Sequence, residues 1–232
     1  MHWHRCAVCT PAEPACTLRI FFCTGDAMIR RAPILATRAA SIPADYTIAP
    51  LSVEQYHAMA RAGILEEGAP IELLEGYLVE KMTKRPPHRV AAQLVELALR
   101  QVIPADYHTA MQEPITLEDS EPEPDVAVVQ GTIRDYSARH PYAHEVPLVV
   151  EIADATLERD RYSKRRICAR AGIPCYWIVN LLDQMVEVYS EPSGQTAQPF
   201  YFNQRSFSES ESVPVEIHGQ HVGVISVKSI LP

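Results

Sequence analysis

Residues 148–192, LVVEIADATLERDRYSKRRICARAGIPCYWIVNLLDQMVEVYSEP, contain the pattern that decides the fold. Residues 148–153 and 175–180 are short apolar runs rich in β-branched and aromatic side chains, which is typical of buried strands. Between them, residues 156–171 form a polar stretch of helix length that a Gly-Ile-Pro sequence closes. Another strand is expected over residues 185–190. The stretch therefore predicts a strand, a helix and two further strands.

The residues on either side continue the alternation of helix and strand signals. Ser52 precedes a helical pattern with Gln55 three residues later, a capping box for a short helix that ends at Gly63. We expect a hairpin, a helix, two strands and, near the C-terminus, a final strand pair, over residues 70–82, 88–103, 107–111, 125–129, 213–217 and 222–227. This order predicts an α/β or α+β domain with a central mixed sheet flanked by helices.

The composition fits a globular protein and excludes several other classes. The 232 residues are 47% hydrophobic and 22% charged, which is too ordinary for a wholly disordered chain. No stretch of about 18 uncharged apolar residues is present, so the sequence predicts no membrane-spanning helix. The formal net charge of −8 gives no global attraction to nucleic acid or anionic lipid. A nucleic-acid partner would therefore need a local basic patch.

The first 45 residues differ from the rest. They carry five basic and three acidic residues, whereas residues 46–232 carry 16 basic and 26 acidic ones. Because they also lack sustained apolar periodicity, we interpret residues 1–45 as a disordered leader or as a start assigned too early, with Met28 as the later start, and residues 46–232 as the domain. A zinc site is the alternative, because four side chains of the kind that zinc binds lie close together: His2, His4, Cys6 and Cys9.

Cysteine usage indicates a compartment. Four of the six cysteines fall in the first 45 residues, and only Cys168 and Cys175 follow. Two cysteines seven residues apart inside a helix–loop–strand pattern do not make a disulfide framework. We therefore expect a cytoplasmic protein.

Two carboxylates stand out in the apolar strands. Asp125 follows a proline and opens the strand over residues 125–129, and Glu151 lies inside the strand over residues 148–153. A carboxylate in so apolar a strand is costly to bury unless it is paired or binds a metal ion. Strand positions hold side chains rigidly, which suits ligands of a hard cation such as Mg²⁺. The alternatives are a turn or cap carboxylate for Asp125 and a solvent-facing acid on an edge strand for Glu151.

The helix after Glu151 carries a strong basic patch. Its cations are Arg159, Arg161, Lys164, Arg165, Arg166 and Arg170. Contact with phosphate groups needs such a patch, although a solvated helix face has the same composition. Asp160 and Lys164 share one helix face, and a plain surface ion pair is the alternative to a role in a site.

These residues resemble a known group of nucleases. Pro124-Asp125 followed by Glu151 on the next strand resembles the PD-(D/E)xK nuclease superfamily. The longer stretch over residues 150–192, the sequence Glu-Leu-Leu-Glu-Gly at 72–76 and His88 at the start of a long helix resemble the bacterial Uma-two family of restriction-endonuclease-like proteins. The resemblance covers the chain from about residue 46 to its C-terminus.

The resemblance implies a restriction-endonuclease-like core and metal-dependent hydrolysis of DNA phosphodiester bonds with Mg²⁺ or Mn²⁺. Asp125 and Glu151 would be catalytic metal ligands, and Glu72 a catalytic acid contributed by an early element. The usual lysine of the E-x-K motif is replaced by Ala153, and Lys164 on the following helix matches the lysine of this family.

The remaining positions are supporting ones under the same resemblance. Asp160 and His88 would support the catalytic residues. The DNA backbone would be held by Arg161, Arg165 and Arg166.

The expected partners are DNA and a second copy of the chain, because cleavage of both strands of a DNA duplex favours two active sites. The alternative is a catalytically inactive descendant of the nuclease fold that binds DNA or has a structural role, since fold does not fix function. The acidic body favours this alternative slightly, because it repels DNA away from the patch. The intact acids and Lys164 favour the nuclease. The sequence does not decide whether the substrate is DNA or RNA, or whether cleavage is sequence-specific.

Overall fold

The computed structural model describes residues 45, 47–66 and 68–232. The interpretations of residues 1–44, including the leader, the later start and the zinc site, lie outside the described residues. The contacts divide the chain into two units at residue 48, and the unit Ile48–Pro232 contains every described helix and strand. Among the described residues, no helix is long and apolar enough to cross a membrane.

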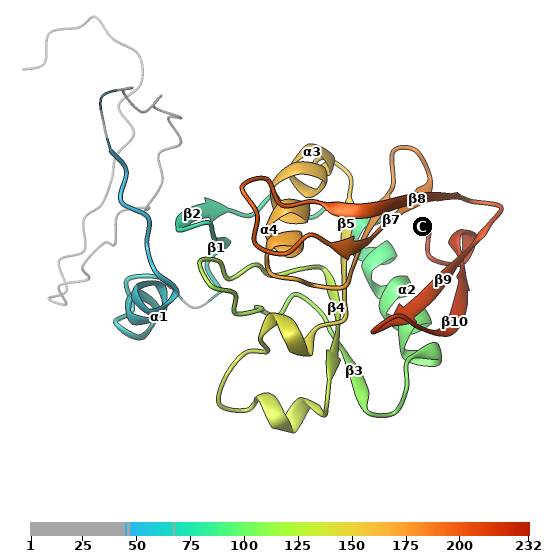
Figure 1. Cartoon of the computed structure of the whole chain (residues 1–232), viewed down its shortest axis with the longest axis horizontal. Coiled ribbons are helices and arrows are strands. Elements are labelled where there is room, and N and C mark those ends of the chain that lie inside the picture. The colour runs from blue at the N-terminus through green and yellow to red at the C-terminus, as the bar shows by residue number, and fades with distance from the viewer. Residues whose placement is uncertain (1–44, 46, 67) are drawn as a thin grey trace, which may run out of the picture. The chain divides into compact units, whose positions relative to one another are not determined.

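A six-stranded sheet forms the centre of this unit (Figure 1). Its strands lie in chain order: β3 (Tyr107–Ala110), β4 (Val126–Gln130), β5 (Leu148–Ala153), β6 (Cys175–Asn180), β7 (Met185–Pro192) and β8 (Tyr201–Ser208). The β5–β6 pair is parallel and the other neighbours are antiparallel. This arrangement confirms the predicted central mixed sheet, and a structural likeness reported below supports the restriction-endonuclease-like core.

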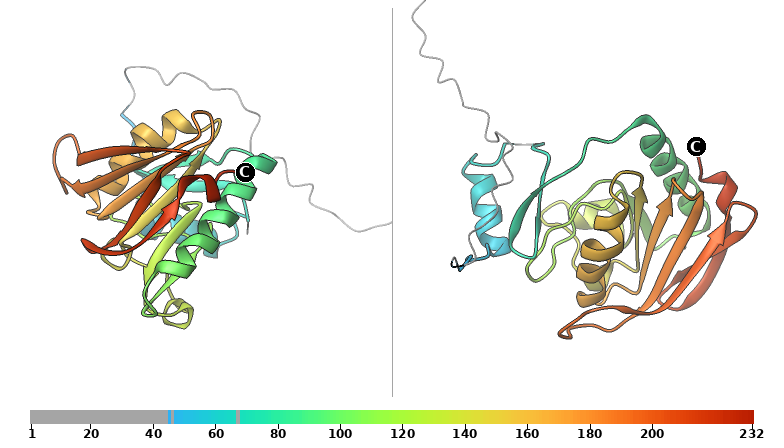
Figure 2. Two further views of the ribbon diagram at one scale, coloured as in Figure 1. Left: turned by 90° about the vertical axis from the view of Figure 1, so that its right-hand side faces the viewer. Right: turned by 90° about the horizontal axis from the view of Figure 1, so that it is seen from above.

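Period-two alternation along β5 divides the core between the two faces of the sheet. Leu148, Val150 and Ile152 pack in a cluster with helix α2 (Pro86–Val102) and the separate hairpin of β9 (Ser212–Ile217) and β10 (Gln220–Ser226). Val149 and Ala153 pack on the other face with helix α4 (Arg165–Arg170). Figure 2 shows α2 and α4 on opposite sides of the sheet. Glu151 points to the α4 face, as the alternation predicts.

The first elements form as the sequence predicts. Helix α1 (Val53–Arg61) begins with a capping box in which Ser52 Oγ accepts from the Gln55 N–H (3.2 Å) and the Gln55 side chain accepts from the Ser52 N–H. Strands β1 (Ile71–Leu74) and β2 (Tyr77–Glu80) pair as a hairpin. Its turn residues, Glu75 and Gly76, both have positive φ, as a type I′ turn requires.

The structure differs from the prediction in the helix after β5. Instead of one regular helix over residues 156–171, it has α3 (Leu157–Arg159), a π-helical segment η3 (Asp160–Lys164) and then α4. Three short 3₁₀ helices were also not predicted: η1 (Ile133–Tyr136), η2 (Ala143–Glu145) and η4 (Val227–Ser229). Single π-helical turns inside α-helices are frequently found at functional sites, which draws attention to η3.

Candidate active site

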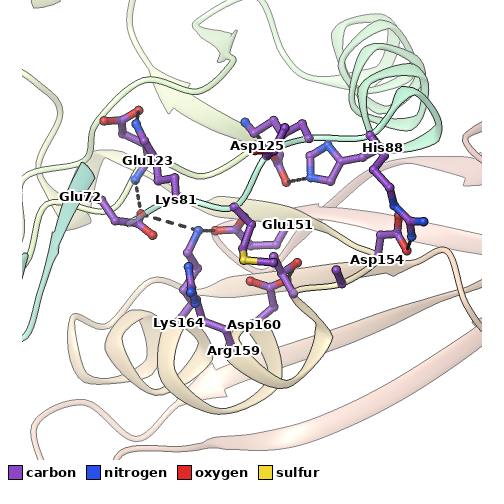
Figure 3. Close-up of a pocket in the computed structure, with 16 residues that line it drawn as sticks. Glu72, Lys81, His88, Glu123, Asp125, Glu151, Asp154, Arg159, Asp160 and Lys164 are labelled. Carbon is purple, nitrogen blue, oxygen red and sulfur yellow. Dashed lines mark hydrogen bonds and ion pairs between the residues drawn. The ribbon is translucent and has the colours of Figure 1, made fainter. Parts of the chain in front are cut away.

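A pocket opens where β4, β5, η3 and the connection from β2 to α2 meet (Figure 3). Six carboxylates and five cationic side chains line it, together with His88. The carboxylates are Glu72, Glu123, Asp125, Glu151, Asp154 and Asp160, and the cations are Lys81, Lys84, Arg85, Arg159 and Lys164. Every residue that the sequence analysis assigned to catalysis or support lies in this lining.

Asp125 immediately precedes β4 and is 4% exposed. Its Oδ2 accepts from the backbone N–H of Ile152 on the neighbouring strand (2.9 Å) and lies 3.0 Å from His88 Nε2. Its Oδ1 lies 3.0 Å from the ammonium of Lys84. Burial would raise the pKa of Asp125, but the hydrogen bond and charge of His88, the charge of Lys84 and the Ile152 N–H lower it to about 2.

Glu151 and Lys164 form a buried ion pair. The Lys164 ammonium donates to Glu151 Oε1 (2.9 Å) and lies 3.7 Å from Glu72 Oε2. Glu72 comes from β1, and its Oε2 also accepts from the backbone N–H of Glu123 (3.3 Å). Burial alone would lower the pKa of Lys164, but the carboxylates of Glu151, Glu72 and Asp160 raise it above its ordinary value. Lys164 is therefore a charged ammonium between acids from three separate elements.

The π-helical segment brings Asp160 and Lys164 into the pocket together. Both are buried, although they come from a helix whose other residues are largely half-buried or exposed. The carbonyl oxygen of Asp160 accepts from the Arg165 N–H and from the buried hydroxyl of Tyr176 (3.0 Å). The Tyr176 hydroxyl, which projects from β6, thus stabilises the widened turn. Asp160 Oδ2 accepts from the Thr156 hydroxyl (2.6 Å), and burial raises the pKa of Asp160 to about 6.

The donor set fits a hard divalent cation. Asp125 and Glu151 present carboxylate oxygens from adjacent strands to one pocket. Burial, with the charges of Asp125 and Asp160, raises the pKa of Glu151 well above its usual value, and the Lys164 ammonium opposes this shift. In the described part of the chain, no three His, Cys, Asp or Glu side chains form a ready metal cage. Mg²⁺ does not need such a cage of protein ligands, because it is usually held by one or two carboxylates together with water and substrate phosphate.

The sequence model of the Uma2 family, described as "Putative restriction endonuclease", matches residues 53–224. The chain belongs to this family. The family predicted from the sequence is thereby confirmed.

A solved structure supports the same conclusion about the fold. It is described as "a putative nuclease belonging to DUF820 from Anabaena variabilis" and has a TM-score of 0.57 to this chain at 16% identity. The likeness covers 78% of this chain and 97% of that chain, and it shows a shared fold. No curated protein matches the chain significantly.

In this member of the Uma2 family, the E-x-K position cannot supply the cation. Ala153 is fully buried in the core on the α4 face and carries no charge. Lys164 lies in contact with Glu151 instead, as the sequence analysis expected from the family pattern. The alternative of a surface Asp160–Lys164 ion pair does not fit, because both side chains are buried.

The three arginines predicted to hold DNA lie outside the pocket lining. Arg161 pairs with the buried Glu187, and its Nε donates to both carboxylate oxygens (3.1 Å each). Arg166 pairs with Glu75. The guanidinium of Arg165 lies over the ring of Tyr189, 4.8 Å from its centre. Ion pairs therefore neutralise Arg161 and Arg166, whose charge the sequence suggested would be free to contact phosphate. The predicted contact of the three arginines with DNA stays a prediction.

Three cations that line the pocket from the β2–α2 connection were not predicted from the sequence. Lys81, Lys84 and Arg85 belong to the sequence KMTKR, which stands directly before the two prolines that begin α2. Three cations in five residues form a recognisable local signal. Their position over the acids depends on the hairpin and α2 packing against the sheet, which the sequence alone does not show.

Proposed function

We propose that this protein is a metal-dependent endonuclease that hydrolyses phosphodiester bonds of DNA. The observation that carries the proposal is the convergence of Asp125, Glu151 and Lys164 in one pocket of a chain that belongs to a restriction-endonuclease family. Two carboxylates and a buried ammonium are the groups needed to bind a hard cation and a phosphate side by side.

Asp125 and Glu151 would hold Mg²⁺ or Mn²⁺. The bound ion would lower the pKa of a coordinated water and neutralise charge on the phosphate. The sheet fixes the position of Asp125, because the Ile152 N–H donates to its Oδ2. His88 supports the same oxygen from the first turn of α2. The chain therefore presents this carboxylate in one orientation before any ligand arrives.

Lys164 would stabilise the negative charge that develops on the attacked phosphate. Its ammonium is held by Glu151 and Glu72, so its orientation costs little reorganisation during the reaction. Asp160 supplies further negative charge near the ammonium and keeps it protonated. Glu72 and Asp160 thus act by positioning Lys164.

The substrate suggests the assembly. A cut through both strands of DNA requires hydrolysis of one phosphodiester bond in each strand, so we expect a homodimer that presents two pockets. We also expect the protein to act in the cytoplasm, where its buried thiols Cys168 and Cys175, which are free in this structure, stay reduced.

Cleavage of supercoiled plasmid DNA tests the proposal. We expect nicked and linear products with Mg²⁺ or Mn²⁺, none with EDTA, and a loss of activity of at least about 100-fold in Glu151→Gln. Glu151→Gln keeps the shape of the side chain, and circular dichroism checks that it folds. If wild-type protein cleaves neither DNA nor RNA under any of these conditions, the inactive DNA-binding or structural descendant is the correct account.

A further inference from the structure

The connection between β2 and α2 crosses the pocket as a cationic strap, which we define as residues 81–85. It has no regular secondary structure, and four of its five residues are exposed. Its cations are Lys81, Lys84 and Arg85, and all three line the pocket. The strap is therefore an irregular and largely exposed part of the pocket wall.

Each cation of the strap is paired with a different acid of the pocket. Lys81 Nζ lies 2.5 Å from Glu123 Oε2, and Lys84 Nζ lies 3.0 Å from Asp125 Oδ1. Arg85 pairs with Asp154, directly after β5. The three acids come from the loop before β4, the start of β4 and the end of β5, so the ion pairs fasten the strap along the pocket mouth.

The middle pair has a direct consequence for the proposed metal ligand Asp125. Lys84 contacts one carboxylate oxygen, while Ile152 and His88 contact the other. A carboxylate offers about four lone-pair sites, and these groups use three of them, so a divalent cation that binds both oxygens competes with one of the three groups. Which of the three contacts the cation displaces depends on how firmly the rest of the structure holds each group in place.

Lys84 is the group that can leave most easily. The Ile152 N–H belongs to the backbone of β5, and the His88 side chain is only 9% exposed. The Lys84 side chain is 33% exposed and projects from the irregular strap on a flexible four-carbon chain. Ion pairs with this much solvent contact contribute only about 1 kcal/mol or less, so a divalent cation can replace one.

We propose that Lys84 competes with the divalent cation for Asp125, so that metal binding and release of the strap are one coupled event. The inference rests on the proposed metal-dependent function and adds a regulatory contact to it. In the metal-free protein the strap neutralises the acids of the pocket. When the metal binds, the Lys84 ammonium is freed at the pocket mouth, where a substrate phosphate would lie.

Isothermal titration of the full-length protein with Mn²⁺ tests this coupling without measuring cleavage. We expect Lys84→Gln to bind Mn²⁺ roughly fivefold more tightly than wild type, the factor that corresponds to a lost competing ion pair of about 1 kcal/mol. Lys84→Arg keeps the charge and should bind Mn²⁺ as wild type does. Thermal unfolding of each variant confirms that it folds.

Arg159→Gln is the matched control. Arg159 lines the same pocket, but its guanidinium donates to the backbone carbonyl oxygen of Glu80 (3.2 Å). This variant removes the same charge without removing a contact to Asp125, so it measures the through-space effect alone. We expect it to tighten Mn²⁺ binding less than Lys84→Gln does.

The outcomes separate this inference from the proposed function. Lys84→Gln that binds Mn²⁺ no more tightly than wild type or Arg159→Gln overturns the inference alone. Absence of Mn²⁺ binding in wild type and in Lys84→Gln overturns the metal proposal and the inference with it.

Discussion

Lys164 is the residue on which the charge balance of the pocket depends. Its ammonium is buried with two carboxylates, Glu151 at 2.9 Å and Glu72 at 3.7 Å. Removing one partner of a buried ion pair is strongly destabilising, because the remaining charge is left without compensation. The same contact that would serve catalysis therefore also serves stability.

We expect Lys164→Met to lower the free energy of unfolding by about 3–5 kcal/mol at neutral pH, because Glu151 and Glu72 lose their shared cation. Urea unfolding followed by circular dichroism measures this change. The double variant Lys164→Met with Glu151→Gln should recover part of the lost free energy of unfolding, since it removes one of the two carboxylate charges that have no cation beside them. A single variant as stable as wild type would show that the buried acids are compensated in another way.

The strand alternation in β5 predicted correctly which way Glu151 points, because apolar neighbours on both sides fix the register. The partners of the residue were harder to predict. The contacts of Lys84 and Lys81 join residues that lie far apart in the chain, and local pattern carries no information on such pairs.

At the scale of the elements, the turn between β1 and β2 positions Glu72. Gly76 has φ +79°, and a Cβ built on it would collide with the side chain of Pro50. Its N–H also donates to the carbonyl oxygen of Asp119 (2.8 Å), which ties the hairpin to the segment before β4. The turn therefore has no room for a larger residue.

We expect Gly76→Ala to destabilise the protein by more than the roughly 1–2 kcal/mol that a left-handed conformation costs an alanine, because the collision with Pro50 adds to the strain. Gly63→Ala is the control, since Gly63 also has positive φ but has open space around it. Chemical denaturation of both variants gives the comparison. Equal losses in the two would mean that the hairpin shifts freely away from Pro50.

Two elements show where prediction from sequence reaches its limit. Strand β8 was missed because its sequence, YFNQRSFS, is mostly polar and only two of its residues are buried at the edge of the sheet. The π-helical segment was missed because it is stabilised by the Tyr176 hydroxyl from β6, a tertiary contact. Helix propensity predicts a regular helix over these residues and takes no account of that contact.

At the scale of the whole molecule, the fold gathers acidic and basic side chains in one pocket of a protein whose formal net charge is −8. The sequence predicted the sheet, its two covered faces and the family, because these depend on hydrophobic period and on a long local motif. The predicted contact of the α3–α4 arginines with DNA stays a prediction, but Arg161 and Arg166 are paired with acids, and the strap, which the sequence did not single out, supplies three of the cations that line the pocket.

The most direct test of the central claim is the rate of Mg²⁺-dependent plasmid cleavage by Lys164→Arg and Lys164→Gln beside wild type. The exposed Lys228, changed to Gln, is the control for loss of one lysine charge. Below the unfolding temperature of every variant, we expect Lys164→Gln to lose about 100-fold or more in rate, Lys164→Arg to keep part of the activity and Lys228→Gln to match wild type. A folded Lys164→Gln that cleaves as fast as wild type would contradict the assignment of this pocket as the active site.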